Sequence, residues 1–257
     1  MSNKPDPPVP LRLVRVDSKR FWIREAFYRE QPSVVFKHGI LLVLGMRDGS
    51  YVTWSTYSNF NLLEQSHLII PVVKTREEDV NRDGKSDKLH FNLEVPVSDS
   101  QDVVSVEMIL VFDYKLNVFA IFALLHTSYG VDAFIQRASF AAGAKFVAEG
   151  DLRLQLKQPL AHKGSDTRYN VAIIDENSVF VEDYTLSNIF SNYLSRNVST
   201  YFDCKYPIWQ TGRGAGQPFI ITGSVSYPEE LIIYPLRLDR RCLYIYLSNR
   251  TGNIPDA

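Results

Sequence analysis

An acidic segment with a single glycine carries the most specific chemistry in this 257-residue sequence. It reads Asp79-Val-Asn81-Arg-Asp83-Gly84-Lys85-Ser-Asp87, which has the D-x-N-x-D-G-x-x-D spacing of a calcium-binding loop. Calcium takes roughly six to eight oxygen ligands, and side chains at alternate positions converge on one ion where the backbone turns sharply at the glycine. The spacing therefore predicts a calcium site with side-chain oxygens from Asp79, Asn81 and Asp83, the carbonyl oxygen of Lys85, and the closing carboxylate of Asp87.

The loop differs from an EF-hand at its last ligand position. An EF-hand needs a bidentate glutamate at the twelfth position, and this sequence has His90 there, which we interpret as the end of a strand rather than as a ligand. Without that glutamate, we expect weak affinity, about 10⁻⁴ to 10⁻³ M, so the site would be filled only outside the cell. The alternative is a solvated acidic turn, because Asp, Asn and Gly also tolerate turn geometry.

No pattern in the sequence indicates catalysis. The five histidines lie in separate segments, and neither an H-E-x-x-H pair nor a C-x-x-C pair occurs. The glycine-rich segment from Gly212 to Gly216 leads into Pro218 and a strand pattern, whereas a phosphate loop leads into a helix N-terminus. The sequence therefore favours a binding or structural protein over an enzyme.

Composition narrows the class of protein further. The formal net charge is −1 and the basic residues form no stripe, so nucleic acid is not expected as a partner. Cys204 and Cys242 are the only cysteines; they define no metal site, and we expect both to be unpaired, although one disulfide between them is the alternative. Two N-glycosylation sequons begin at Asn197 and Asn249, and they matter only if the chain enters the secretory pathway.

Most of the chain from Phe21 onward has strand patterns. Residues 33–46 and 51–57 flank an Arg-Asp-Gly-Ser turn and predict a hairpin, and residues 67–73 and 89–95 predict strands on either side of the acidic segment. Alternating apolar residues predict three further strands, at 103–113, 152–156 and 219–227.

One amphipathic helix stands out among these strands. Its apolar residues fall at helical spacing from Leu186 to Leu194, with Thr185 or Ser187 available as the N-cap. Residues 108–142 fit either helix or buried strand. We therefore predict a mainly β protein, with α+β as the alternative, built as one antiparallel sandwich with one or two amphipathic helices.

The sequence predicts no membrane-spanning helix. Its longest apolar stretch, from Val118 to Leu125, has eight residues, whereas a spanning helix needs about 20. Residues 1–20 have no apolar core of a signal peptide and are predicted to be a disordered, proline-rich leader. Taken by itself, the chain is expected to be soluble.

Several segments within residues 21–235 keep the order and spacing of one known family. The matching segments are Phe21-Trp-Ile-Arg, Tyr28-Arg-Glu-Gln-Pro32, Trp54-Ser-Thr56, Asn59-Phe-Asn61, Thr75 through Phe91, Gly150-Asp-Leu-Arg-Leu154, Lys157-Gln-Pro159, Arg168-Tyr-Asn170, Arg196-Asn-Val-Ser199 and Pro207-Ile-Trp209. Together they resemble the transmembrane protein 231 family of the ciliary transition zone.

The resemblance implies a non-enzymatic role at the base of the cilium. Family members have a membrane helix at each end of an extracellular or lumenal domain, and they belong to the tectonic-containing Meckel syndrome complex. The implied partners are therefore tectonic and Meckel-complex membrane proteins. The implied function is the barrier that controls entry of membrane proteins into the cilium, which supports ciliogenesis and Hedgehog signalling. A calcium-dependent extracellular ligand- or carbohydrate-binding module is the alternative, because the acidic loop would then be the binding element.

The sequence departs from the family at both ends. Residues before Phe21 and after Pro235, where family members have their membrane helices, are charged or proline-rich in this chain. We therefore expect a leader at 1–20, a β-rich ectodomain at 21–235 and a divergent tail at 236–257, as in an alternatively spliced or incompletely predicted product that retains the ectodomain and lacks both anchors. Cys242 and Asn249 fall in that tail.

Overall fold

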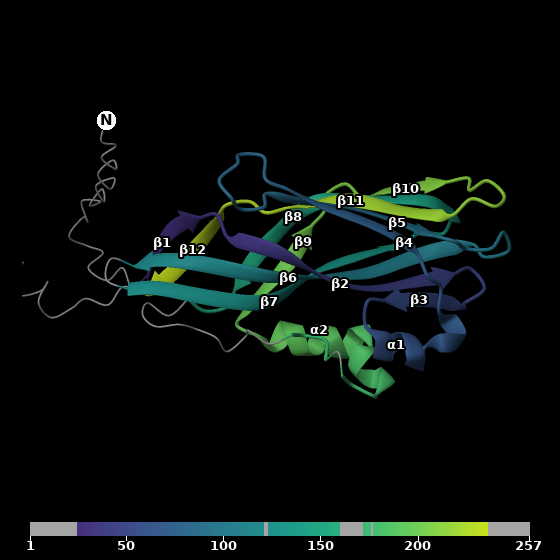
Figure 1. Cartoon of the computed structure of the whole chain (residues 1–257), viewed down its shortest axis with the longest axis horizontal. Helices are drawn as coiled ribbons and strands as arrows, with labels where there is room; N and C mark the ends of the chain where they lie inside the picture. Colours follow the sequence, from purple (N-terminus) through teal and green to yellow (C-terminus); the bar gives the residue numbers. More distant parts are fainter. Residues whose placement is uncertain (1–24, 121–122, 160–171, 176, 236–257) are drawn as a thin grey trace, which may run out of the picture.

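Two packed β-sheets and a short two-stranded ribbon form the fold (Figure 1). The computed structural model describes residues 25–120, 123–159, 172–175 and 177–235. In chain order the elements are β1 (Glu25–Glu30), β2 (Ser33–Met46), β3 (Tyr51–Ser55), α1 (Ser58–Leu63), η1 (Gln65–His67), β4 (Val72–Glu78), β5 (Lys88–Val95), β6 (Val103–Ala120), β7 (Ala123–Ala138), β8 (Gly143–Leu156), η2 (Val181–Tyr184), α2 (Leu186–Ser195), β9 (Val198–Asp203), β10 (Ile208–Thr211), β11 (Phe219–Ser226) and β12 (Glu230–Pro235).

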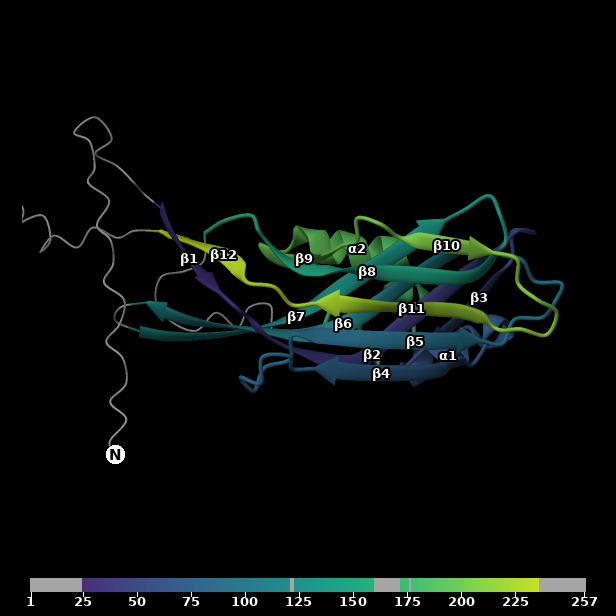
Figure 2. The ribbon, with the colours of Figure 1, turned by 90° about the horizontal axis from the view of Figure 1, so that it is seen from above.

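The two sheets have different strand counts and cross obliquely (Figure 2). The four-stranded sheet has the order β3-β2-β6-β7. The six-stranded sheet has the order β10-β8-β11-β5-β4. Its sixth strand, β9, pairs with the C-terminal half of β8, and β10 pairs with the N-terminal half of the same strand edge. The ribbon pairs β1 with β12 in antiparallel register, from Glu25 opposite Pro235 to Glu30 opposite Glu230.

The core lies between the sheets and follows the alternation of the strands. In β5 every second residue is buried, from Leu89 to Val95, because one face of this strand packs on the core. Residues of β2, β6, β8 and β11 complete the same apolar cluster. The mainly β sandwich predicted from the sequence is therefore confirmed.

One glycine permits the close approach of two central strands. β11 runs antiparallel to β5 but parallel to β8. A Cβ atom on Gly223 would lie 1.9 Å from the carbonyl oxygen of Ala148 and 2.7 Å from the ring of Phe91. A glycine at this position therefore lets β11 lie against β8.

A second apolar cluster covers the other face of the four-stranded sheet. Helices α1, η2 and α2 lie along that face in Figure 1. Phe60 of α1 contacts Tyr184 of η2, with ring centroids 5.3 Å apart, and both are buried with Ile189 of α2 against Leu41 and other sheet residues. In β2 of this sheet, residues 40–44 form a continuous apolar run because apolar clusters cover both faces of the sheet.

The structure confirms several predicted elements and corrects others. The hairpin at residues 33–55, the strand that ends before Pro96 and the helix from Leu186 are present. The strand predicted at 67–73 is wrong, because His67 ends η1 and strand β4 runs from Val72 to Glu78. The charged residues of β4 can form a strand since their side chains project from an edge strand paired with β5.

The segment that fitted either helix or strand forms the β6–β7 hairpin, whose register runs from Ser105 opposite Ala138 to Ala120 opposite Ala123. Helix α1 was not predicted. The predicted leader and tail, and the matching segment at 168–170, lie outside the described residues.

Candidate functional site

The acidic loop connects β4 to β5 at one edge of the six-stranded sheet. The two strands pair up to Glu78 opposite Lys88, so the loop closes a β-hairpin. Its backbone turns at Arg82 and Gly84, which have φ values of 60° and 86°. The turn at the glycine agrees with the geometry that the spacing predicts.

The side-chain oxygens of the loop accept hydrogen bonds from the loop's own backbone. Asp79 accepts from the N–H groups of Arg82 at 2.6 Å and Gly84 at 3.0 Å. Asn81 accepts from Asp83, Asp83 from Lys85, and Asp87 from Val80 and Asn81. Within the described part of the chain, no group of three or more His, Cys, Asp or Glu residues is placed to hold a metal ion. Calcium binding by Asp79, Asn81, Asp83, Lys85 and Asp87 therefore stays a prediction.

Asp87 also fastens the loop to the base of the terminal ribbon. Its Oδ1 atom accepts a hydrogen bond of 2.6 Å from Gln31, which lies between β1 and β2, and its carbonyl accepts from the N–H of Tyr227, just after β11. Lys85 donates its Nζ proton to the Gln31 carbonyl at 3.0 Å. Partial burial raises the pKa of Asp87, but hydrogen bonds from Val80, Asn81 and Gln31 bring it below its ordinary value. We call Gln31, Lys85 and Asp87 the ribbon clamp.

Calcium titration tests the predicted metal site. If the loop binds calcium, the melting temperature of the folded chain should rise at millimolar calcium and return after chelation, because a ligand that binds only the folded state stabilises it. Asp83→Ala removes a predicted ligand, together with the hydrogen bond that Asp83 accepts from the N–H of Lys85, and leaves the Gln31–Asp87 contact in place, so it should abolish the rise. An unchanged melting temperature in both proteins at millimolar calcium would contradict the site.

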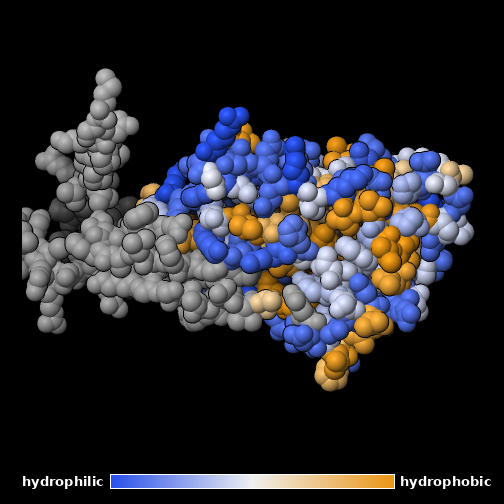
Figure 3. Space-filling view, in the orientation of Figure 1, coloured by the Kyte–Doolittle hydropathy of each residue, from blue (hydrophilic) through white to orange (hydrophobic). Residues whose placement is uncertain are grey.

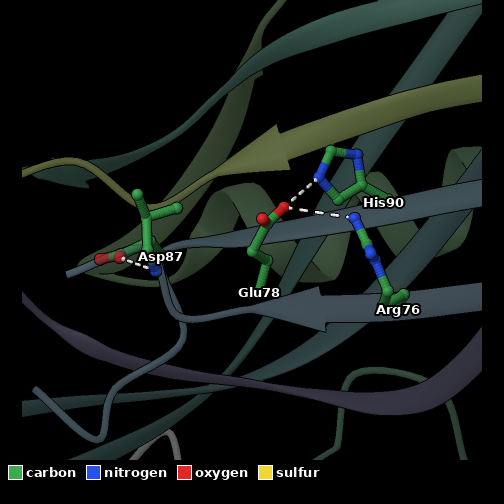
Figure 4. Close-up of polar contacts among 5 residues, drawn as sticks. Arg76, Glu78, Asp87 and His90 are labelled. Carbon is green, nitrogen blue, oxygen red and sulfur yellow. Dashed lines mark hydrogen bonds and ion pairs between the residues drawn. The ribbon is translucent and has the colours of Figure 1, made fainter. Parts of the chain in front are cut away.

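His90 lies beside the loop in a surface cluster with two charged residues (Figure 4). Its Nε2 atom is 2.9 Å from Oε2 of Glu78, and Nη2 of Arg76 is 3.4 Å from the same oxygen. His90 and Arg76 are opposite each other in the β4–β5 register. The interpretation of His90 as a strand residue is confirmed, and its ring contacts a carboxylate of the neighbouring strand.

Of the two sequons, the one at Asn197 lies at the edge of the folded domain. Asn197 lies between α2 and β9 and is half-buried, and Ser199 of the same sequon is buried in β9. Modification at Asn197 would therefore have to precede folding of this edge. Asn249 and Cys242 lie outside the described residues. Cys204 is half-buried and has no disulfide partner among the residues that the structure describes, and burial raises the pKa of its thiol.

The terminal ribbon is fixed to the sandwich by a second polar contact. Oε1 of Glu230, at the start of β12, accepts a hydrogen bond of 3.1 Å from the N–H of Leu154 in β8 and lies 3.9 Å from Arg153. Burial raises the pKa of Glu230, an effect that the Leu154 hydrogen bond and the Arg153 guanidinium partly oppose. The ribbon therefore leaves the sandwich in a defined direction, held at Gln31 on β1's side and at Glu230 on β12's side.

A buried polar node joins the two sheets beneath α2. The Tyr193 hydroxyl accepts from the N–H of Thr200 in β9 at 2.6 Å and from the N–H of Asp132 in β7 at 3.4 Å. The Thr200 hydroxyl donates to the Asp132 carbonyl at 2.9 Å. Both carboxylate oxygens of Asp132 are buried without a hydrogen-bond partner among the described residues, and burial raises the pKa of this group to about 8, against the opposing effect of Arg196.

Sequence reasoning did not identify this node. The only signal is one aspartate in the apolar run Val131-Asp-Ala-Phe-Ile135, and the run by itself does not show that a helix covers it.

Exposed apolar side chains gather over α1 and the residues around η2. In Figure 3 hydrophobic surface is visible along this lower edge of the domain. The contact between Phe60 and Tyr184 places the two elements side by side. The exposed residues, here called the helical patch, are Leu62, Leu63, Val179, Phe180 and Val181.

No helix in the described part of the chain is both long and apolar enough to cross a membrane.

Comparison with known proteins relates this domain to one family. The family model described as Transmembrane protein 231 matches residues 8–242. Transmembrane protein 231 of Gallus gallus is 44% identical over 228 residues, which cover 88% of this chain and 70% of that protein. The Rattus norvegicus and Homo sapiens proteins of the same name are 43% and 42% identical over 228 residues, with 88% of this chain and 71% of each relative covered. No solved structure matches the chain.

Proposed function

Because the chain belongs to the transmembrane protein 231 family, we propose that it is a non-enzymatic subunit of the ciliary transition-zone tectonic-like complex, also called the Meckel syndrome complex. In this role it contributes to the diffusion barrier for ciliary membrane proteins, and thereby to ciliogenesis and Hedgehog signalling. Its β-rich domain lies on the extracellular or lumenal side of the cilium membrane and contacts tectonic and Meckel-complex membrane proteins.

The structural observation that carries this proposal is the pairing of the two ends of the domain. β1 and β12 lie antiparallel with Glu25 opposite Pro235, so the chain enters and leaves the described domain at one place. Flanking segments that extend from a paired ribbon can enter the same membrane side by side. This arrangement suits a domain between two membrane segments, and the ribbon clamp and Glu230 keep the ribbon fixed to the sandwich.

We assign partner contact to the helical patch. Large apolar side chains exposed together on adjacent elements are typical of protein interaction sites. Leu62 of α1 is 71% exposed, and Phe180, directly before η2, is 62% exposed. The buried residues Phe60 of α1 and Tyr184 of η2 anchor these elements to the four-stranded sheet. The patch can therefore present a preformed surface without rearrangement of the core.

The helical patch predicts the result of a co-purification experiment. The chain, displayed on the lumenal side of a membrane in ciliated cells, should recover tectonic and Meckel-complex proteins. Leu62→Asp combined with Phe180→Asp should reduce that recovery by about tenfold or more, since loss of buried apolar contacts at an interface commonly costs at least that factor. Tyr206→Asp removes an exposed aromatic from the β9–β10 connection and serves as the matched control. Equal recovery by the patch variant and the control would contradict the assignment.

A calcium-dependent ligand- or carbohydrate-binding module is the second candidate. In such a module, the side-chain oxygens of the acidic loop would have to give up the hydrogen bonds that they accept from the loop's N–H groups and bind a cation instead. The titration described above tests this candidate independently of partner recovery.

A further inference from the structure

The segments that carry the helical patch contain acidic residues but neither Lys nor Arg. Their sequences, residues 58–73 and 172–195, have no basic side chain of either type, although the whole chain has 28 Lys and Arg against 29 Asp and Glu. Four carboxylates lie beside the exposed apolar residues, here called the acidic rim: Glu64 directly after α1, Asp175 before η2, and Glu182 and Asp183 within η2. The patch is therefore an apolar surface with charges of one sign around it.

Hydrogen bonds hold two carboxylates of the rim in place. Oε2 of Glu64 accepts a hydrogen bond of 3.2 Å from the Tyr51 hydroxyl and lies 3.1 Å from Nδ1 of His67. Oδ1 of Asp175 accepts a hydrogen bond of 2.9 Å from the N–H of Asn177. The rim therefore has a positioned carboxylate on the α1 side of the patch and another on the η2 side.

The other two carboxylates of the rim are exposed on η2. Asp183 accepts a hydrogen bond from the Ser178 hydroxyl, and neither Glu182 nor Asp183 forms an ion pair with a basic residue among those that the structure describes. The first basic residue after them is Arg196, beyond the C-terminus of α2, where its guanidinium carbon lies 6.0 Å from the centroid of the Tyr193 ring. Ten residues of helix separate it from η2 by about 15 Å, which exceeds the screening length of about 10 Å at 0.1 M salt.

We propose that the helical patch binds a basic amphipathic helix of a partner protein, with apolar side chains on the patch and Lys or Arg beside Glu64, Glu182 and Asp183. The inference rests on the proposed function, because that function requires a protein partner at this surface. Complementary charges steer the encounter and disfavour partners of the wrong sign. The apolar residues of the patch supply the buried contacts, and the acidic rim selects which amphipathic segment can make them.

A helix suits the patch better than an extended peptide. Extended peptides that bind to sheets gain main-chain hydrogen bonds from a free strand edge. The residues of the patch belong to α1, to η2 and to the turn before η2, so they present side chains rather than a strand edge. A helix satisfies its own backbone hydrogen bonds and places apolar residues on one face at i, i+3, i+4 and i+7.

The acidic rim argues against a lipid surface as the occupant of the patch. Helices that lie on membranes combine an apolar face with Lys and Arg, because these cations attract lipid phosphates. In the helical patch, carboxylates surround the apolar residues, and lipid phosphates would repel them. The sign of the rim therefore favours a basic protein segment over a membrane.

Binding of two matched helical peptides to the whole chain tests the inference. The first probe is a fluorescent amphipathic peptide of about 18 residues with Leu at helical spacing and Lys at the flanking positions, and the second carries Glu in place of each Lys. Wild-type chain should bind the Lys peptide at least about tenfold more tightly than the Glu peptide, because several charge pairs of a few tenths of a kcal/mol add to the same apolar contacts. High salt should reduce this difference.

Two variants separate the charges of the patch from its apolar residues. Glu182→Lys with Asp183→Asn should weaken binding of the Lys peptide by about tenfold and strengthen binding of the Glu peptide. Asparagine can still accept the hydrogen bond from Ser178. Leu62→Ser with Phe180→Ser leaves the charge unchanged and should also weaken binding of the Lys peptide by about tenfold or more, because it removes exposed apolar contacts.

A control with the same change of charge lies on the other sheet. Glu149→Lys with Asp151→Asn alters β8, which belongs to the sheet on the opposite side of the molecule from the helices (Figure 1). Asparagine at position 151 can still accept the hydrogen bond that Asp151 receives from Arg153. This control should change the affinity for either peptide by less than about twofold. Melting temperatures show which variants are folded, and the rim and apolar variants change different side chains, so either one alone tests the inference.

The outcomes distinguish the inference from the proposed function. Equal binding of both peptides by wild-type chain, or a control that loses as much binding as the rim variant, would overturn the inference. Flotation of wild-type chain on phosphatidylcholine vesicles that is lost in the Leu62–Phe180 variant would also overturn it, because a lipid surface would then occupy the patch. In ciliated cells, the rim variant should lose tectonic and Meckel-complex proteins that wild-type chain recovers, and retained recovery would overturn the inference alone. Absent recovery by wild-type chain that still prefers the Lys peptide would contradict the proposed function and support the charge assigned to the patch's partner.

Discussion

Replacement of Asp132 by asparagine is expected to make the domain more stable at pH 8 and to remove most of its stability loss between pH 5 and pH 8. The Asp132 carboxyl is buried without a hydrogen-bond partner among the described residues, and its pKa is about 8. The folded chain therefore holds this proton up to about pH 8, whereas the unfolded chain releases it near pH 4. Between these values the folded state binds more protons than the unfolded state, so the free energy of unfolding falls as the pH rises.

The expected magnitude is large for a single side chain. Each unit of pH within this window removes up to about 1.4 kcal/mol, so the wild-type chain should lose about 3 kcal/mol between pH 5 and pH 8 from this group. Asparagine keeps the shape of the side chain and does not ionise. Chemical unfolding at both pH values measures the difference between the two proteins.

A surface carboxylate on the neighbouring strand provides the control. Glu107 of β6 contacts Gln136 of β7 at the surface, and Glu107→Gln makes the matching change from carboxyl to amide at an exposed position. This variant sets the reference slope of stability between pH 5 and pH 8. If Asp132→Asn showed the same slope as Glu107→Gln, the Asp132 carboxyl would have to be ionised in the folded chain, in contradiction to its assignment.

Loss of the Tyr193 hydroxyl is expected to destabilise the domain by about 2–3 kcal/mol. Tyr193→Phe leaves the N–H of Thr200 and the N–H of Asp132 without their acceptor, both in a buried position. An unsatisfied buried donor costs about 1–3 kcal/mol, and the aromatic packing against Phe134 is retained. Thermal unfolding measures the change.

Tyr201 offers a matched comparison one residue beyond Thr200. It is exposed on β9, and Tyr201→Phe should change the free energy of unfolding by less than about 0.5 kcal/mol. Because Tyr193 and Asp132 contact each other, Tyr193→Phe and Asp132→Asn should not be additive in the double variant. An equal, small effect of Tyr193→Phe and Tyr201→Phe would show that the hydroxyl does not join α2 to the two sheets.

The local patterns of the sequence were sufficient for elements with a single buried face. β5 alternates and ends before Pro96, and α2 has apolar residues at helical spacing, so each could be predicted from its own residues. β4 could not, because its charged residues form a strand only through pairing with β5. The first part of β6 was predicted as a strand, at 103–113, from its alternation, whereas residues 108–142 also fitted a helix, because apolar residues of this hairpin pack into clusters on both faces of the sheet.

The candidate site residues, too, could be predicted from local sequence patterns only in part. The spacing around Gly84 predicted the turn of the acidic loop, but not that Asp87 would fasten the loop to Gln31, a residue 56 positions away. Asp132 gave almost no signal because its burial depends on Tyr193 from a distant helix. The pairing of the two ends of the domain, which carries the proposed function, is likewise a long-range contact that no local pattern encodes.

Proximity labelling at the ciliary base tests the central claim most directly. The chain, anchored with its domain on the lumenal or extracellular side, would carry the labelling enzyme, and the same enzyme on an unrelated anchored β-sandwich would set the background. The account predicts enrichment of tectonic and Meckel-complex proteins over that background. Labelling at the transition zone that recovers none of them would contradict the assignment of this chain as a subunit of the complex.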